Sequence, residues 1–105
     1  MGAFVPSTST KFLSVEEDSH TYLFHCPGCD MLHEIWDKQA KRDRGWDFNG
    51  DLNNATFSPS YLTRYPMRGV DVICHSFIEN GNIRFLDDCT HKLAGHTVPL
   101  PDIPE

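Results

Sequence analysis

The sequence predicts a small, mainly β domain that is built from β-hairpins and stabilised by zinc. Three observations lead to this prediction. A C-x2-C turn, Cys26-Pro-Gly-Cys29, separates two alternating segments, Asn80-Gly81 separates two more, and no segment carries a clear helical stripe. The chain has 105 residues, the length of one domain, and only 39% of them are hydrophobic. A modest core of this kind gains stability from a metal cross-link.

The chain divides into a lead-in and one domain. Residues 1–18 are polar and predict a loose lead-in, with a short edge strand around residues 11–15. Residues 19–105 form the single zinc-binding, β-rich domain. The proline-rich tail, residues 98–104, is expected to be extended because proline cannot continue a helix.

Two hairpins form the predicted framework. Residues 20–25 and 32–37 alternate on either side of the cysteine turn, so the cysteine pair lies at the tip of the first hairpin. Residues 70–79 and 83–86 flank Asn80-Gly81, the strongest hairpin signal in the chain.

The two-residue turn of the second hairpin sets its register. It predicts three cross-strand pairs: Glu79 with Asn82, Phe77 with Arg84, and Cys74 with Asp87. On this register Cys74 shares one face with Cys89, while His75 points to the opposite face, close to Asp88.

The middle of the chain has weaker signals. Residues 38–44 are charged and lack an apolar stripe, so we expect a solvated loop there rather than a helical turn. A brief aromatic strand at residues 46–48 ends at Asn49-Gly50. Residues 55–57 form a further strand, which Ser58-Pro-Ser60 breaks before it resumes at 61–64.

The cysteines predict a zinc knuckle. Zn²⁺ prefers four soft or borderline ligands in a tetrahedron, and a C-x2-C turn aims two sulfurs at one point. The predicted ligands are Cys26, Cys29, Cys74 and Cys89. His75, His91 or His33 could replace Cys74 or Cys89, since Cys₃His and Cys₂His₂ sites also occur. A redox pair is disfavoured because no strand alternates with a long helix.

A second polar cluster is a candidate catalytic site. His75, Asp88 and His91 fall together around the second hairpin, on the side opposite the zinc ligands. They have general-base and metal-binding capacity, and Asn49, Asp51 and Ser58 are further candidates for a polar pocket. We favour the alternative interpretation, in which His75 and Asp88 satisfy each other and His91 caps the turn that follows.

Charge and hydropathy limit the partners. The formal net charge is −6, and four thiolates around one Zn²⁺ would lower it to about −8. Nucleic-acid binding is therefore disfavoured. A local basic segment, residues 38–44, remains a candidate for it. No apolar run approaches a membrane span and no secretory signal opens the chain, which predicts the cytoplasm. Closely spaced cysteines in a reducing compartment favour a metal over disulfides.

Several sequence blocks resemble a known family. They are Cys26-Pro-Gly-Cys29, Phe48-Asn-Gly-Asp51, Thr56-Phe-Ser-Pro-Ser60, Cys74-His-Ser-Phe77 and Asp88-Cys-Thr-His91. Together they resemble a family of small, uncharacterised zinc-binding proteins of tailed bacteriophages and prophages. The resemblance implies a phage accessory protein that acts in the bacterial host cytoplasm.

Three functions follow as hypotheses. The favoured one is a non-catalytic binding protein that contacts a host or defence protein, because an acidic surface suits a basic partner. The second is a small metal-assisted hydrolase that uses His75, Asp88 and His91. The third is a nucleic-acid-binding module that uses residues 38–44. The oligomeric state is not predicted.

Overall fold

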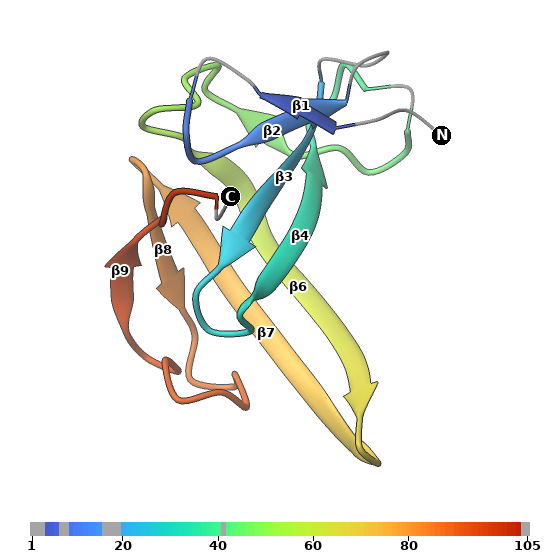
Figure 1. Ribbon diagram of the computed structural model, residues 1–105, viewed down its shortest axis with the longest axis vertical. Helices are drawn as coiled ribbons and strands as arrows, with labels where there is room; N and C mark the ends of the chain where they lie inside the picture. The colour runs from blue at the N-terminus through green and yellow to red at the C-terminus, as the bar shows by residue number, and fades with distance from the viewer. Residues whose placement is uncertain (1–3, 7–8, 16–19, 41, 104–105) are drawn as a thin grey trace.

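The computed structural model of the protein describes residues 4–6, 9–15, 20–40 and 42–103. These residues form nine strands and no helix, in two antiparallel sheets (Figure 1). The prediction of a mainly β domain is therefore confirmed. No helix that could cross a membrane occurs in the described part of the chain.

The first sheet has four strands in sequence order. These strands are β1 (Phe4–Pro6), β2 (Leu13–Val15), β3 (Thr21–Cys26) and β4 (Met31–Trp36). The second sheet has five strands, also in sequence order. These are β5 (Asp47–Phe48), β6 (Phe57–Met67), β7 (Val70–Glu79), β8 (Asn82–Phe85) and β9 (Thr97–Pro99).

The β3–β4 hairpin forms as predicted, with the cysteine turn at its tip. The last pair of the ladder joins Cys26 to Met31, and the Asp30 N–H donates to the Cys26 carbonyl at 2.8 Å to close the turn. The predicted edge strand at residues 11–15 corresponds to β2, and β1 pairs with it. The predicted boundary after residue 18 falls outside the described residues.

The β7–β8 hairpin also forms, on the predicted register. Its turn residues Asn80 and Gly81 both have positive φ, 51° and 81°, as a two-residue turn of this type requires. The pairs of Glu79 with Asn82 and of Phe77 with Arg84 are confirmed.

The register prediction fails beyond the end of β8. The ladder stops at the pair of Ser76 with Phe85, so Cys74 does not face Asp87. The Cys89 N–H instead donates to the Leu86 carbonyl at 3.2 Å in a tight turn. That turn carries the chain away from β7 before it returns.

Strand β6 is longer than predicted, because Ser58-Pro-Ser60 bulges without ending it. Phe57 pairs with Ile78 and Tyr61 with Ser76, with a register shift between them. Three residues of β6, 58–60, thus lie opposite one residue of β7. Such bulges re-aim side chains and are frequent beside active sites.

The predicted loop at 38–44 is confirmed for its described residues, which lie in turns and bends. Two of its basic side chains pair with acids: Lys38 with Asp47 at 3.0 Å, and Arg42 with Glu34 at 2.6 Å. This pairing reduces the positive charge that the segment offers to a nucleic acid.

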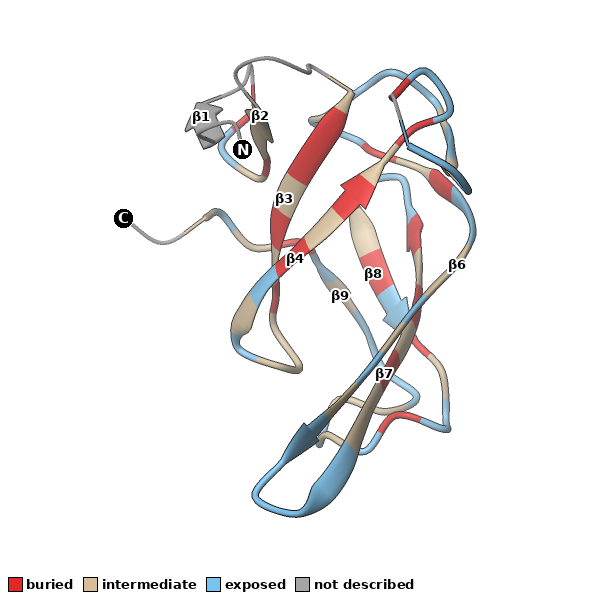
Figure 2. Cartoon of the chain, turned by 90° about the vertical axis from the view of Figure 1, so that its right-hand side faces the viewer, coloured by how far each residue is buried: buried red, intermediate tan, exposed pale blue. Residues whose placement is uncertain are grey.

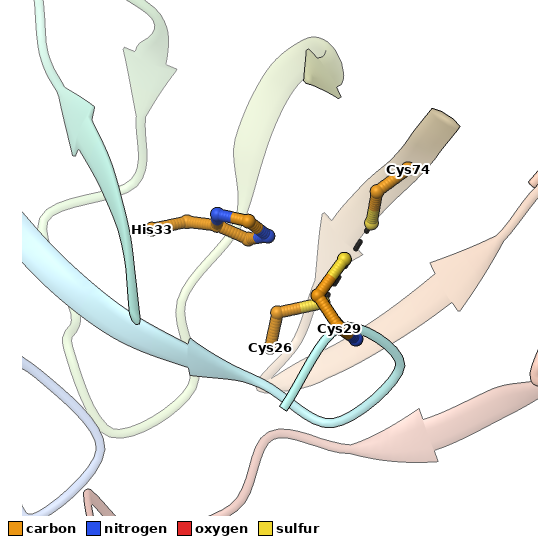
Figure 3. Close-up of side chains that lie close together, drawn as sticks. All are labelled: Cys26, Cys29, His33 and Cys74. Carbon is orange, nitrogen blue, oxygen red and sulfur yellow. Dashed lines mark hydrogen bonds between the residues drawn. The ribbon is translucent and has the colours of Figure 1, made fainter. Parts of the chain in front are cut away.

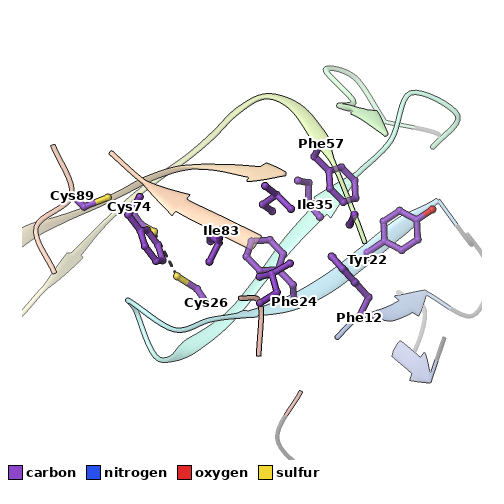
Figure 4. Packing of buried hydrophobic residues seen from close by; sticks show 13 residues of the cluster. Phe12, Tyr22, Phe24, Cys26, Ile35, Phe57, Cys74, Ile83 and Cys89 are labelled. Atoms are coloured by element: carbon purple, nitrogen blue, oxygen red, sulfur yellow. Dashed lines mark hydrogen bonds between the residues drawn. The ribbon is translucent and has the colours of Figure 1, made fainter. Parts of the chain in front are cut away.

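The core lies between the two sheets (Figure 4). The largest fully buried apolar side chains come from both sheets and from the segments beside them: Phe12, Phe24, Ile35, Phe57, Ile78, Ile83, Phe85 and Leu100. Cys26 and Cys74 are buried in the same cluster, at the end nearest the cysteine turn.

Candidate active site and candidate metal centre

Strand β7 presents different chemistry on its two faces. Side chains alternate across a strand, and along β7 Cys74, Ser76 and Ile78 are buried, whereas His75 and Phe77 are partly exposed. The inner face therefore carries a thiol into the core, and the outer face carries an imidazole to the surface. A separate cluster of functional side chains gathers on each face.

The inner cluster joins the cysteine turn to β7. One ligand atom from each of Cys26, Cys29, His33 and Cys74 lies within 4.8 Å of the other three (Figure 3). The turn supplies two of the thiols, β4 supplies the imidazole and β7 supplies the third thiol. Cys26 Sγ and Cys74 Sγ are 3.6 Å apart, and no disulfide joins the four cysteines. The arrangement ties the first sheet to the second.

The cluster favours one thiolate surrounded by hydrogen-bond donors. Hydrogen bonds from Cys26, Cys74 and His33 hold the pKa of the Cys29 thiol well below its usual range. The hydrogen bond with Cys29 raises the pKa of Cys26 to about 11, and hydrogen bonds with Cys26 and Cys29 raise the pKa of Cys74. Three thiols packed together cannot all ionise by themselves, and a bound cation removes that conflict.

The inner cluster fits a metal ion. Its donors are three sulfurs and one imidazole, the ligand types that Zn²⁺ prefers. His33 is 7% exposed, and its Nε2 is buried without a hydrogen-bond partner among the described residues. An orphaned imidazole nitrogen is costly in a core unless it binds something. The four side chains can therefore hold a metal ion.

Cys89 and His91 lie beside this cluster in a second group that also includes Cys74. Cys89 Sγ contacts the backbone of His75, where it accepts from the N–H and donates to the carbonyl, both at 3.2 Å. Burial raises the pKa of the Cys89 thiol. The structure thus brings His33, rather than Cys89, together with the other three predicted ligands.

His91 packs against the cysteine turn. A Cβ added at Gly28 would lie 2.3 Å from its ring, so only glycine leaves room for this contact. His91 Nδ1 accepts the Leu93 N–H at 3.2 Å, which places the proton of a neutral ring on Nε2. In that tautomer Nε2 carries the proton and has no lone pair for a metal, and it is buried without a hydrogen-bond partner among the described residues. The predicted turn-capping role of His91 matches its bond to Leu93.

The outer cluster is a chain of three side chains. Ser60 Oγ lies 2.9 Å from His75 Nε2, and His75 Nδ1 lies 3.0 Å from Asp88 Oδ2. The side chain of His75 is 25% exposed and that of Asp88 is 55% exposed, so the chain of bonds opens to solvent.

Two local features place these groups. The bulge at residues 58–60 turns Ser60 onto the outer face, above His75. On the other side, the segment after β8 is fastened to β7: the Leu86 N–H donates to the His75 carbonyl at 2.9 Å, and the Thr90 N–H to the Ile73 carbonyl at 3.0 Å. Asp88 lies between these two attachments and faces the imidazole.

This geometry is that of a nucleophile, a base and an orienting acid. When Nδ1–H donates to Asp88, the lone pair of Nε2 can accept the Ser60 hydroxyl proton. Such an arrangement is recognised by geometry and roles, and it recurs on unrelated folds.

The structure brings together some of the predicted catalytic residues and adds one. His75 and Asp88 meet as expected, but His91 lies on the other side of β7. Ser58 pairs with Asp47 of β5 and is exposed, so it does not reach the histidine. Ser60 was missed because no local motif marks it. The bulge in β6 places Ser60, and not Ser58, against His75.

Asn49 and Asp51 stabilise a turn instead of forming a pocket with the histidine. Asn49 Oδ1 accepts the N–H groups of Asp51 and Thr56. The Asp51 carboxylate in turn accepts the backbone N–H groups of Asn53 and Asn54.

In this β-rich domain a serine contacts a histidine, and the histidine contacts an aspartate. Serine hydrolases have this arrangement. Comparison with known families agrees with this class. The chain belongs to the family described as bacterial ubiquitination-like system serine protease (BubE), whose model matches residues 4–86. The match includes Ser60 and His75 and ends two residues before Asp88. No curated protein and no solved structure matches the chain.

The family corrects the favoured functional hypothesis. The prediction that the chain acts by binding a host or defence protein is wrong, because the matching family is one of proteases. The hydrolase hypothesis, built on His75, Asp88 and His91, agrees better with the family, although Ser60 rather than His91 contacts His75. The match says nothing of a phage origin, which stays a prediction.

Proposed function

We propose that the protein is a serine protease of a bacterial ubiquitination-like system, with Ser60 as nucleophile and His75 as general base. One observation carries this proposal: both ring nitrogens of His75 are engaged, one by a hydroxyl and the other by a carboxylate. A histidine that only satisfied Asp88 would not require a serine re-aimed by a bulge on its other side. The family description supports the same reaction class.

The reaction follows from these contacts. Ser60 Oγ attacks the scissile carbonyl carbon while His75 Nε2 takes the hydroxyl proton. As the tetrahedral intermediate collapses, the bond to the leaving group breaks and His75 returns the proton to that group. Water then attacks the acyl-serine, with His75 again as base, to release the acid and regenerate the hydroxyl.

Asp88 is a positioning residue in this scheme. Its carboxylate accepts Nδ1–H, fixes the tautomer of His75 and stabilises the imidazolium that forms. Because the Asp88 side chain is 55% exposed, water screens its charge. We therefore expect Asp88→Asn to lower kcat by about 10² to 10³, less than the roughly 10⁴ typical of a buried aspartate.

The inner cluster is the proposed zinc site, with Cys26, Cys29, Cys74 and His33 as ligands. Bound Zn²⁺ would supply a structural cross-link between the β3–β4 hairpin and β7. The orphaned Nε2 of His33 supports its place in the set. Cys89, the fourth ligand expected from the sequence, is the alternative. Reduced thiols at such a site suit a reducing compartment such as the bacterial cytoplasm.

Active-site labelling tests the nucleophile. A fluorophosphonate probe reacts with an activated serine by forming an O–P bond and releasing fluoride. We expect the folded protein to gain one probe per chain, with Ser60 as the modified residue in peptide mass spectrometry. Ser60→Ala and His75→Ala should abolish labelling, because the nucleophile or its base is missing.

Ser58 is the matched control. It lies two residues from Ser60 on the same bulged strand, is exposed, and pairs with Asp47 instead of approaching His75. Ser58→Ala should therefore label like the unmodified protein. Equal labelling of Ser60→Ala, or labelling that survives heat denaturation, would refute the proposal.

Two substitutions identify the fourth zinc ligand. If His33 is the ligand, His33→Ala should lower the zinc content from about one per chain to below half after dialysis, whereas Cys89→Ala keeps its zinc. Elemental analysis gives the stoichiometry, and the visible spectrum of the cobalt-substituted protein reports the number of thiolates. Zinc lost from Cys89→Ala and kept in His33→Ala would establish the four-cysteine set instead.

A further inference from the structure

The outer face of β6 and β7 surrounds the outer cluster of Ser60, His75 and Asp88, which we call the triad. Leu62 of β6 lies directly across the ladder from His75. Paired residues in an antiparallel ladder project from the same face, with Cβ atoms about 5 Å apart. Leu62 therefore shares its face with His75 and Ser60, and its side chain is 58% exposed.

The charged neighbours of Leu62 on this face are paired with one another. On the side of the β6–β7 turn, Arg64 pairs with Asp71 at 3.5 Å. On the other side of His75, Arg84 pairs with Glu79 at 3.1 Å, and its guanidinium lies 4.6 Å from the centre of the Phe77 ring.

Among the described residues, Leu62 is the large apolar side chain beside the triad that is classed as exposed. Ile73 and Phe77 flank His75 on this face of β7. Both are only partly exposed, and Arg84 lies over the Phe77 ring. Leu62 is 58% exposed, and Figure 2 shows the end of the β6–β7 hairpin farthest from the core as exposed.

We propose that Leu62 determines specificity: it receives an apolar side chain of the polypeptide substrate, next to the scissile bond. This inference rests on the proposed protease function and names its substrate class, a polypeptide with an aliphatic or aromatic residue at a position flanking the cleaved bond. The side chain that contacts Leu62 belongs to the substrate, because Leu62 and the triad lie on one continuous face. A polypeptide attacked by Ser60 Oγ must therefore lie across that face.

The spacing supports direct contact. Two residues along a strand span about 6.6 Å, so Leu62 lies one same-face step from Ser60. An extended substrate advances by about 3.3 Å per residue. A carbonyl held at Ser60 Oγ thus places a side chain of the next one or two residues over Leu62, where apolar contact removes both groups from water.

Cleavage-site profiling tests the inference. A proteome-derived peptide library is digested with the protein, and the cleaved bonds are read by mass spectrometry. We expect Leu, Ile, Val, Met or Phe to be enriched at one position flanking the cleaved bond. Leu62→Asp should remove that enrichment and lower kcat/KM on an enriched peptide by about tenfold or more, mainly through KM. Leu62→Met, which keeps an apolar surface, should retain the profile.

Val70→Asp is the matched control. Val70 is also an exposed apolar residue, 63% accessible, but it lies five residues from His75 along β7, about 16 Å away, beside the hairpin turn. Its substitution should leave the profile and KM unchanged. Fluorophosphonate labelling of Leu62→Asp at Ser60 should persist, which separates loss of specificity from loss of the triad.

Two results would overturn the inference. Cleavage by the unmodified protein with no apolar enrichment, or an enrichment that survives in Leu62→Asp, would remove Leu62 from substrate recognition while leaving the triad intact. A library that stays uncut, together with absent labelling at Ser60, would refute the protease function itself and the inference with it.

Discussion

Removal of the bound metal with a chelator is expected to destabilise the protein severely. A structural zinc site contributes about 10–16 kcal/mol of apparent binding free energy, whereas a whole domain is stable by only about 5–15 kcal/mol. The proposed site joins the two sheets through Cys26 and Cys74, which are both buried in the common core. We expect the free energy of unfolding to fall by at least about 5 kcal/mol and the melting temperature by about 20 °C or more.

Circular dichroism during heating, before and after EDTA treatment, measures this effect. Restoring a slight excess of Zn²⁺ should recover the original melting temperature, which controls for damage by the chelator. Cys29→Ser should reproduce the chelated state without any chelator. An unchanged melting curve in a sample shown to be metal-free would contradict a structural metal.

The parts of the fold that follow local rules could be predicted from the sequence. Asn80-Gly81 fixes a two-residue turn, and the turn fixes the pairs of Glu79 with Asn82 and of Phe77 with Arg84. The same register placed Cys74 and His75 on opposite faces of one strand, as the structure has them. The prediction lost accuracy beyond Phe85, where the chain leaves the ladder and a turn rather than a strand positions Asp88 and Cys89.

Ser60, which was not predicted from the sequence, and His33, which was predicted only as an alternative ligand, both reach their clusters through long-range packing. Ser60 reaches His75 because β6 bulges between Phe57 and Tyr61, and neither serine of Ser58-Pro-Ser60 is marked by sequence as the one that turns outward. His33 joins the thiols because the first hairpin lies over β7, a contact between two sheets that no local pattern encodes. The sequence predicts which types of side chain could act as ligand and base, whereas the side chains that come together depend on how the sheets pack.

The two clusters are adjacent through the backbone, which affects how substitutions must be interpreted. Cys74 precedes His75, and Cys89, which follows Asp88, contacts the backbone of His75 at 3.2 Å. Loss of a metal ligand will therefore disturb the triad together with the fold, and an inactive Cys74 variant says nothing about catalysis. The catalytic role has to be tested with residues on the outer face alone.

His75→Ala is expected to remove activity and leave the protein as stable as before. Polar groups held for catalysis are kept at some cost to stability, so their removal is often neutral or stabilising. His75 is partly exposed, and water can satisfy Ser60 and Asp88 when the imidazole is gone. We expect kcat/KM on a cleaved peptide to fall by at least about 10⁴, with a melting temperature within a few degrees of the original.

Ser60→Ala is the matched variant, because it removes one oxygen atom from the same outer face. It should show the same combination of full stability and lost activity, and the double variant should be no less active than either single one, since the two residues act as a unit. The structural alternative predicts a different pattern: His75→Ala would lose about 1–3 kcal/mol from its broken hydrogen bonds. Activity would then fall only as far as the folded fraction does. Thermal melting and peptide cleavage measured on the same samples distinguish the two, because a stable and inactive His75→Ala protein is compatible only with a catalytic histidine.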